Sequence, residues 1–438
     1  MNEYKAESEK LLAFLKKCPT AFHSVEAIRN ELEGAGFSRL REEDSWTVKP
    51  GDCRYVIRNG SGIIAFRADA AGEGYCFKLG AVHGDYPCFK LKELPEMKSG
   101  TYIRLDVEGY GGMICSTWLD RPLSVAGRVI VKEGGRFTEK LVNIDRDLLL
   151  IPSLPIHMNR EVNDGFKFNK QVDLLPLWSL AEGEQPSVKQ LVAKELGAEP
   201  ENIAGADLYL YPRTEPSLWG ASEEFISSAH LDDMQCGYAV LQGFLKGKGE
   251  NAVNVCACFD NEEVGSGTRQ GADSDFLYDV LRRVNAALGF SEEAYSRAVA
   301  GGFCVSADNA HALHPNHPEK YDENNRVFMN GGIVIKANAS QKYASDAVSA
   351  AMFRGVCEKA GVPVQSFANR SDMPGGSTLG NISSSRVPLR TVDIGPAQLA
   401  MHSAYETAGV KDTLWLAQAM EAFYAARIGS APDGFTIE

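Results

Sequence analysis

Apolar residues recur at helical spacing near the start of the chain and then give way to short runs typical of strands. Leu11, Leu12, Phe14 and Leu15 form one apolar stripe, so the pattern predicts two helices within residues 6–34. Strand-like runs follow at 55–58, 62–67, 76–82 and again between about 100 and 135. A polar stretch at 181–202 predicts a surface loop that leads into a short helix.

From about residue 225 onward the pattern changes, because strand-like runs now alternate with helical ones. The expected strands are 254–259, 332–337 and 388–393, and the expected helices are 234–245, 274–287, 344–360 and 413–427. Such alternation predicts an α/β sheet with helices on its faces. We therefore expect an α/β domain built from residues 1–90 and 226–438, interrupted by a β-rich insertion at 91–225.

Composition narrows the class of protein. With 438 residues, 44% hydrophobic and 24% charged, the chain is long enough for two globular domains. Its longest apolar runs fall well short of the roughly 20 residues of a membrane helix, and residues 1–5 do not resemble a signal peptide. We expect a cytoplasmic protein that binds no membrane.

Charge and cysteine usage agree with that expectation. The formal charge is −13 with no long basic run, so nucleic-acid binding has little support. The ten cysteines include no CxxC pair and are expected to be free thiols, mostly in the core.

Five short polar motifs each stand where a strand-like run ends in a loop. They are VHGD (82–85), HLDD (230–233), FDNEEVG (259–265), SADNAH (306–311) and AMHS (400–403). In open α/β sheets, sites form outside the carboxyl ends of strands, so these loops can converge although they are distant in sequence.

The residue types in these motifs suit a pair of divalent cations. Two such ions, about 3.5–4 Å apart, need carboxylate oxygens and imidazole nitrogens, including one carboxylate that spans both. The ions polarise a carbonyl and acidify a shared water, and an unligated carboxylate beside that water accepts its proton. The adjacent Glu262 and Glu263 would allow one to be a ligand and the other the base.

Taken singly, each motif has an ordinary structural explanation. A lone His-x-Asp is usually a surface or hydrogen-bonded pair, and adjacent glutamates usually form a solvated face. Asp232 and Asp233 suit a helix cap, Asp308 suits a turn, and His402 suits a buried, hydrogen-bonded histidine. Composition alone leaves these alternatives open.

In their order along the chain, the motifs resemble those of the aspartyl aminopeptidase family, whose members are dizinc exopeptidases. The matching blocks are PTAFHSV (19–25), GAGF (34–37), IIAF (63–66), VHGDYPC (82–88), TWLDRPLSVAGR (117–128), IPSLPIHMNR (151–160), FDNEEVG (259–265), SADNAHA (306–312), KYAS (342–345), GGSTLG (375–380) and DIGPAQLAMHS (393–403). The resemblance implies a zinc-exopeptidase-like α/β/α sandwich with a β-rich dimerisation or lid insertion. It also implies removal of N-terminal residues from peptides.

The resemblance also implies the metal ligands. Asp232 would bridge both cations, His83 and Asp308 would complete one site, and Glu263 and His402 would complete the other. The expected cations are two Zn2+ ions, with Co2+ or Mn2+ compatible with the same ligands.

Further roles follow from the same resemblance. Glu262 would be the general base and acid, and Asp85 would accept a hydrogen bond from the His83 ring and fix its tautomer. Lys336 and Tyr343 match positions that line the substrate pocket, although a strand-end lysine explains Lys336 equally well.

Self-association is implied as well, since family members assemble into hollow tetrahedral homododecamers. They place a histidine from a neighbouring subunit's insertion at the active site, and His157 occupies the matching block. Activity would then require assembly.

The chain departs from the family pattern in two motifs. The first reads His-Gly-Asp where many relatives have His-Thr-Asp, and the second reads Leu-Asp-Asp rather than Leu-Asp-Asn. No ligand is lost, but Asp233 adds negative charge near the metals. The sequence leaves open the preferred N-terminal residue, acidic or neutral, and the native metal.

Two other functions compete with this hypothesis. One is a dizinc deacylase or carboxypeptidase of a related fold, which usually lacks the DIGPAQLAMHS block. The other is a catalytically silent binding shell, against which the retained Glu262 argues.

Overall fold

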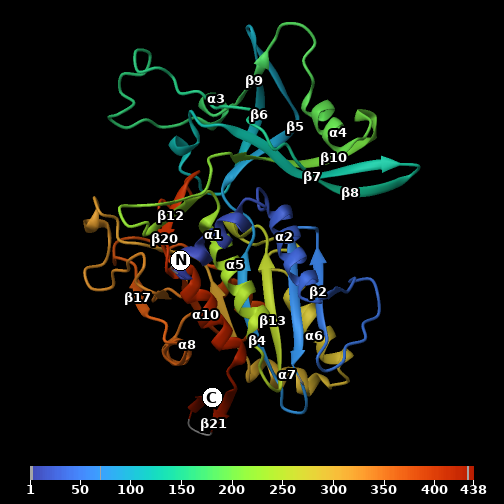
Figure 1. Ribbon diagram of the computed structural model, residues 1–438, viewed down its shortest axis with the longest axis vertical. Coiled ribbons are helices and arrows are strands. Elements are labelled where there is room, and N and C mark those ends of the chain that lie inside the picture. Colours follow the sequence, from blue (N-terminus) through green and yellow to red (C-terminus); the bar gives the residue numbers. More distant parts are fainter. Residues whose placement is uncertain (1–2, 70, 432–433) are drawn as a thin grey trace. The chain divides into compact units, whose positions relative to one another are not determined.

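A computed structural model of the protein describes residues 3–69, 71–431 and 434–438, which form two compact units (Figure 1). The first unit lies within residues 1–85, 217–401 and 406–438, and the second comprises Tyr86–Pro216 and His402–Tyr405. The sequence-based boundaries, 91 and 225, each lie a few residues further along the chain. The sequence analysis did not predict that the short segment 402–405 belongs to the second unit.

A nine-stranded mixed sheet forms the centre of the first unit, in the order β1-β2-β3-β13-β4-β14-β18-β16-β17. These strands are β1 (Ser38–Arg39), β2 (Cys53–Arg58), β3 (Gly62–Asp69), β13 (Ala252–Phe259), β4 (Cys76–His83), β14 (Phe303–Ala307), β18 (Arg390–Gly395), β16 (Ile333–Ala337) and β17 (Val364–Ala368). The runs expected at 55–58, 62–67, 76–82, 254–259 and 332–337 are confirmed as strands. The run expected at 388–393 begins and ends two residues later.

Three neighbouring strands in the middle of this sheet run in the same direction. β4 pairs in parallel with β13 on one side and with β14 on the other. Every residue of β13 is buried, as expected for a strand covered on both faces. The carboxyl ends of these three strands therefore meet at one edge of the sheet.

Helices cover both faces of the sheet (Figure 1). One face packs against α1 (Glu3–Leu15), α2 (Ala21–Gly34), α5 (Leu231–Lys246), α8 (Ala347–Ala360) and α10 (Asp412–Ala425). The other packs against α6 (Phe276–Ala287), α7 (Glu292–Ala300) and α9 (Leu379–Arg386). Along β3, Ile63 and Ala65 join the first core while Ile64 and Phe66 join the second. This period of two produces the α/β/α sandwich that the sequence predicted.

A smaller sheet and a terminal hairpin complete the first unit. The five-stranded sheet has the order β11 (Ser217–Trp219), β12 (Phe225–Ser228), β20 (Glu406–Gly409), β19 (Ala397–Leu399) and β15 (Ala310–His311). The hairpin pairs β21 (Ile428–Ala431) with β22 (Gly434–Ile437). Short 3-10 turns in the chain are η1 (Cys115–Trp118), η2 (Pro200–Asn202), η3 (Glu262–Val264) and η4 (Pro318–Lys320).

The second unit is built on a six-stranded antiparallel sheet with its own hydrophobic core. Its order is β8 (Arg136–Asn143), β7 (Leu123–Glu133), β10 (Ile203–Pro212), β5 (Cys88–Ser99), β6 (Tyr102–Tyr110) and β9 (Leu177–Leu180). Two helices accompany it, α3 (Lys170–Asp173) and α4 (Val188–Leu196). The expected loop and short helix within 181–202 correspond to the segment that contains α4.

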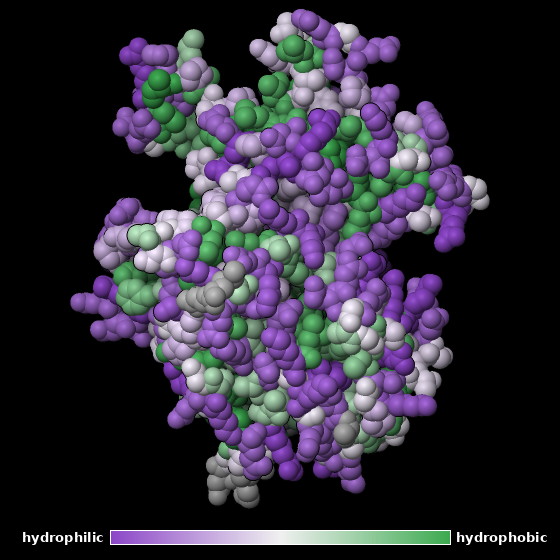
Figure 2. Space-filling view, viewed as in Figure 1, coloured by the Kyte–Doolittle hydropathy of each residue, from purple (hydrophilic) through white to green (hydrophobic). Residues whose placement is uncertain are grey.

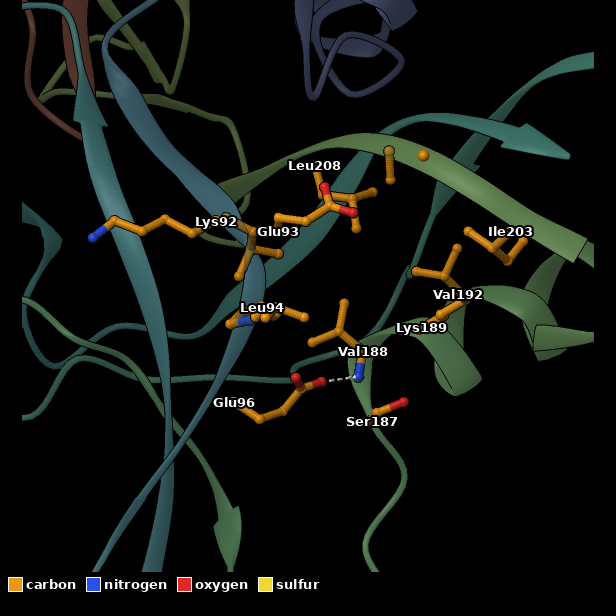
Figure 3. A pocket seen from close by; sticks show the side chains of 14 residues that line it. Lys92, Glu93, Leu94, Glu96, Ser187, Val188, Lys189, Val192, Ile203 and Leu208 are labelled. Carbon is orange, nitrogen blue, oxygen red and sulfur yellow. Dashed lines mark hydrogen bonds between the residues drawn. The ribbon is translucent and has the colours of Figure 1, made fainter. Parts of the chain in front are cut away.

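A cavity of about 280 Å³ opens within this second unit, between β5, β10 and the start of α4 (Figure 3). The Glu96 carboxylate accepts a hydrogen bond from the Val188 backbone N–H at 2.6 Å. This acid therefore satisfies one of the unpaired donors at the start of α4. The described residues that line the cavity include no histidine or cysteine, and we assign it no chemistry.

All ten cysteines lie in the described part of the chain and are free, and seven of them are buried, as the sequence predicted. Within the described residues, every helix is too short or too polar to cross a bilayer.

Candidate metal centre

Three of the expected site residues stand at the shared edge of the central parallel strands. His83 is the last residue of β4, Asp308 directly follows β14, and Glu262 begins the η3 turn shortly after β13. Because β13, β4 and β14 are parallel neighbours, their carboxyl ends deliver these side chains to one place.

The side chains that the sequence singled out in the first unit gather into one cluster. Ligand atoms of His83, Asp232, Asp233 and Asp308 all lie within 4.8 Å of one another, and so do those of His83, Glu262 and Glu263. The His83 Nε2 atom lies 3.6 Å from Asp232 Oδ1. His83 belongs to both groups and joins them into a single centre.

Contacts of the Nδ1 atom fix the orientation of the His83 ring. Its Nδ1 atom lies 3.0 Å from the backbone carbonyl oxygen of Asp85 and 3.5 Å from the Asp85 carboxylate. Asp85 therefore faces the His83 ring with both groups, and its backbone carbonyl oxygen is the closer acceptor. This bond selects the tautomer that carries a lone pair on Nε2, the atom that faces Asp232.

The Asp85 carboxylate also holds the loop after β13. Its two oxygens accept hydrogen bonds from the backbone N–H groups of Glu262 and Glu263, both at 3.1 Å. The turn that carries the two glutamates is flanked by left-handed backbone, at Asn261 (φ 63°) before it and at Gly265 (φ 96°) after it, conformations that Asn and Gly adopt most readily. Asp85 thus fixes both glutamates through their backbone.

The start of α5 presents two aspartates with different contacts. Asp232 departs from helical geometry (φ −83°, ψ 110°), and its backbone N–H donates to Glu406 Oε2 at 2.9 Å. The Asp233 carboxylate accepts a hydrogen bond from the His83 backbone N–H at 3.2 Å. Asp233 therefore helps to hold the end of β4, and it also contributes a buried carboxylate to the cluster.

Asp308 is held by a buried lysine. The Lys336 Nζ atom donates to the Asp308 backbone oxygen at 2.8 Å and lies 3.7 Å from its carboxylate. The same ammonium lies 5.3 Å from the centre of the Tyr343 ring. Both residues expected in the substrate pocket are buried in this structure, and Lys336 is only 2% exposed.

The close packing of buried acidic side chains changes the pKa values of the cluster. Burial, reinforced by the Asp308 and Glu263 carboxylates, raises the pKa of Glu262 to about 8. Burial also raises the pKa of Asp233 and of Asp308. Burial alone would lower the pKa of His83, but the neighbouring Asp232 and Asp85 carboxylates raise it well above the ordinary value.

These shifts indicate an excess of negative charge in a poorly hydrated place. Carboxylate oxygens with one imidazole nitrogen are ligands that Zn2+, Mn2+ and Co2+ accept. A divalent cation would stabilise the ionised carboxylates and so offset the cost of their burial. The residues present therefore fit a divalent metal centre.

Two expected site residues belong to the second unit. His402 begins the segment 402–405, and its Nδ1 atom lies 3.0 Å from the backbone carbonyl oxygen of Gly112. His157 lies in the long connection between β8 and α3, where its side chain is exposed.

Comparisons with known proteins agree with this geometry. The family model of the aminopeptidase I zinc metalloproteases (M18) matches residues 14–424. The chain belongs to the M18 aminopeptidase family. A probable M18 family aminopeptidase 2 of Clostridium acetobutylicum is 46% identical over 427 residues, covering 95% of this chain and 98% of the relative.

Solved structures of the M18 family extend the likeness to the fold. A chain in the cryo-EM structure of the Ape4 and Nbr1 complex has a TM-score of 0.94 at 35% identity, covering 96% of this chain and 86% of that one. The S. cerevisiae mApe1 dodecamer has a TM-score of 0.84 at 26% identity, covering 97% of each chain. The predicted family, the zinc-exopeptidase-like fold and the metalloaminopeptidase activity are thereby confirmed.

Three residues in contact with the centre had no role in the sequence-based set of ligands. Asp233 was noted only for its charge, Lys336 only for the pocket, and Glu406 not at all. Each acts on the backbone of an expected ligand, and such contacts leave no motif in a sequence. Glu406 in particular is a lone acid in a four-residue strand, 174 positions away from the N–H that it accepts.

Proposed function

We propose that this M18 aminopeptidase removes single residues from peptide N-termini with two divalent cations at the cluster described above. Asp232 would hold both cations, His83 and Asp308 would complete one site, and Glu263 and His402 would complete the other. The observation that carries the proposal is the gathering of ligand atoms of His83, Asp232 and Asp308 within 4.8 Å of one another.

His402 enters the proposal through its sequence block and its own local geometry. A hydrogen bond from Nδ1 to the Gly112 carbonyl supports the tautomer with a lone pair on Nε2, as the Asp85 carbonyl does for His83. Both proposed imidazole ligands thus have the same kind of backbone support.

Glu262 is the proposed proton carrier. When bound, the cations polarise the scissile carbonyl and acidify the attacking water. The Glu262 carboxylate accepts a proton from that water and returns it to the leaving amine. Asp85 keeps Glu262 and Glu263 at a fixed spacing through their backbone N–H groups, which supports separate roles for the two neighbours.

Substrate preference is proposed from the buried lysine. Lys336 and Tyr343 line the pocket for the N-terminal side chain, and the ammonium favours an acidic one, Asp or Glu. The contact of Lys336 with Asp308 places a cation next to the proposed metal ligands, which supports this location.

Assembly is proposed to complete the active site, with a homododecamer, by analogy with the mApe1 dodecamer, as the expected form. The segment around His157 exposes apolar side chains in the single chain, with Leu154 58% and Met158 76% exposed. Figure 2 shows green atoms among purple ones on this loop, at the upper left. Such exposure supports contact with another subunit, to whose active site His157 would contribute.

The proposed metal is Zn2+ and the proposed compartment is the cytoplasm, which the free cysteines support. A panel of aminoacyl chromogenic substrates, assayed with metal-replenished enzyme, tests the activity and its preference. We expect turnover of N-terminally unblocked substrates that stops with chelator and returns with Zn2+. Turnover only of N-acylated substrates, or of none, would contradict the proposed reaction.

A further inference from the structure

Helix α5 begins irregularly, with non-helical backbone at Asp232 and Asp233. The residue in its N-cap position is His230, in left-handed backbone (φ 65°), and its side chain makes no capping hydrogen bond. The first N–H groups of a helix have no partner within the helix, and leaving such a group buried and unpaired costs free energy. The Asp232 N–H, buried and outside regular helical geometry, therefore needs an acceptor from elsewhere in the fold.

Glu406 supplies that acceptor. It is the first residue of β20, pairs with Ser228 of β12, and is only 2% exposed. Its Oε2 atom accepts the backbone N–H of Asp232 at 2.9 Å. Because β12 leads directly into the segment before α5, this strand pairing fixes where the carboxylate meets the N–H.

The N–H that Glu406 holds belongs to the residue with the most exacting proposed role. A bridging carboxylate must face two cations, so small rotations of its backbone move both oxygens. Hydrogen bonds from a backbone N–H to an ionised carboxylate are stronger than those to neutral acceptors. An anchor of this kind, at the residue that bears the ligand, limits such rotation.

The same arrangement recurs around the centre. Asp85 holds the N–H groups of Glu262 and Glu263, and Asp233 holds that of His83. Glu406 is the corresponding anchor for Asp232. We propose that Glu406 is a positioning residue of the metal centre. The buried Glu406 carboxylate orients the Asp232 side chain by fixing the Asp232 backbone N–H. This inference rests on the proposed role of Asp232.

Three variants separate the hydrogen bond from the charge. E406A removes the acceptor, E406Q keeps an acceptor oxygen without the charge, and E406D withdraws the carboxylate by one methylene. Metal affinity of the apoprotein is measured by chelator competition, and the visible absorption of the Co2+ form reports ligand geometry. Loss of an outer-shell partner typically weakens metal binding by about 10- to 100-fold. We expect this loss in E406A with an altered Co2+ spectrum, and recovery of most of the affinity in E406Q.

Asp412 provides a matched control. Its buried carboxylate accepts the backbone N–H groups of Asn330 at 2.7 Å and of Gly332 at 3.3 Å in the same unit, so D412A removes similar bonds that touch no proposed ligand. We expect D412A to lower Tm while metal affinity and the Co2+ spectrum stay as in the wild-type protein. Equal losses of metal affinity in D412A and E406A would show that the loss in E406A comes from general destabilisation, and would overturn the proposal.

Further outcomes are equally decisive. Wild-type affinity and spectrum in folded E406A would overturn the positioning role. Should E406A not fold, E406D takes its place, and wild-type metal binding by folded E406D would have the same meaning. D232A, measured alongside, distinguishes the two proposals: if D232A also binds metal normally, the proposed centre itself is wrong, whereas loss in D232A alone removes only the role of Glu406.

Discussion

Glu262 and Glu263 are chemically alike and adjacent, yet the proposed mechanism gives them different tasks. E262Q removes the proton acceptor and keeps the size of the side chain. We expect metal content to stay at the wild-type level while kcat falls by about 10²- to 10⁴-fold, the usual effect of losing a general base. Metal analysis and steady-state kinetics of the same sample test this. Near-normal turnover would show that another group carries the proton.

Lys336 combines a contact with Asp308 and a proposed contact with substrate. K336A should lower kcat/KM for Asp- and Glu-derived substrates by about tenfold more than for a Leu-derived one, since only acidic side chains lose a charge-assisted bond. The comparison uses one enzyme preparation and matched chromogenic leaving groups. Equal losses of kcat/KM on acidic and Leu-derived substrates would show that Lys336 only supports Asp308.

At the level of single residues, the sequence predicted the members of the cluster better than the contacts that support them. His83, Asp232 and Asp308, whose side chains the structure brings together, stand in short polar motifs next to strands. Glu406 was not found, because its function lies in a single contact with a distant backbone N–H. Sequence spacing carries no information on such contacts, which exist only once the sheets have formed.

The elements that were predicted best are those that the sheet buries completely. β4 and β13 are mostly apolar and almost entirely buried, and they were found within a few residues. α9 was missed because its sequence, LGNISSSR, contains a glycine, an asparagine and three serines, all of which weaken helices. Packing against the sheet stabilises this helix. β5 was missed because a register shift between Leu91 and Glu96 interrupts its alternation.

Helix α10 begins with a carboxylate whose titration should affect stability. Burial raises the pKa of Asp412 from 3.8 to about 7, so between these pH values the folded protein binds more protons than the unfolded chain. Through this group, stability therefore falls as pH rises across that range. D412N lacks the titration, and its Tm relative to the wild-type protein should rise from pH 4 to pH 7. A constant or falling difference would contradict the assignment.

At the scale of the whole molecule, the proposed need for assembly can be tested by subunit complementation. H157A and E262Q chains should each be inactive, but mixed particles formed by dissociation and reassembly should recover activity. Such particles contain sites in which an intact Glu262 meets His157 of another subunit. Reassembled single-variant particles are the control. Absence of recovery in verified mixed particles would mean that His157 does not act between subunits.

The proposed mechanism requires five side chains, distant in sequence, to hold two cations. Anomalous X-ray diffraction at the zinc edge, from crystals of the zinc-loaded enzyme, locates such cations. We expect two peaks per subunit, one contacted by His83 and Asp308, the other by Glu263 and His402, with Asp232 between them. A single peak, or peaks away from these residues, would contradict it.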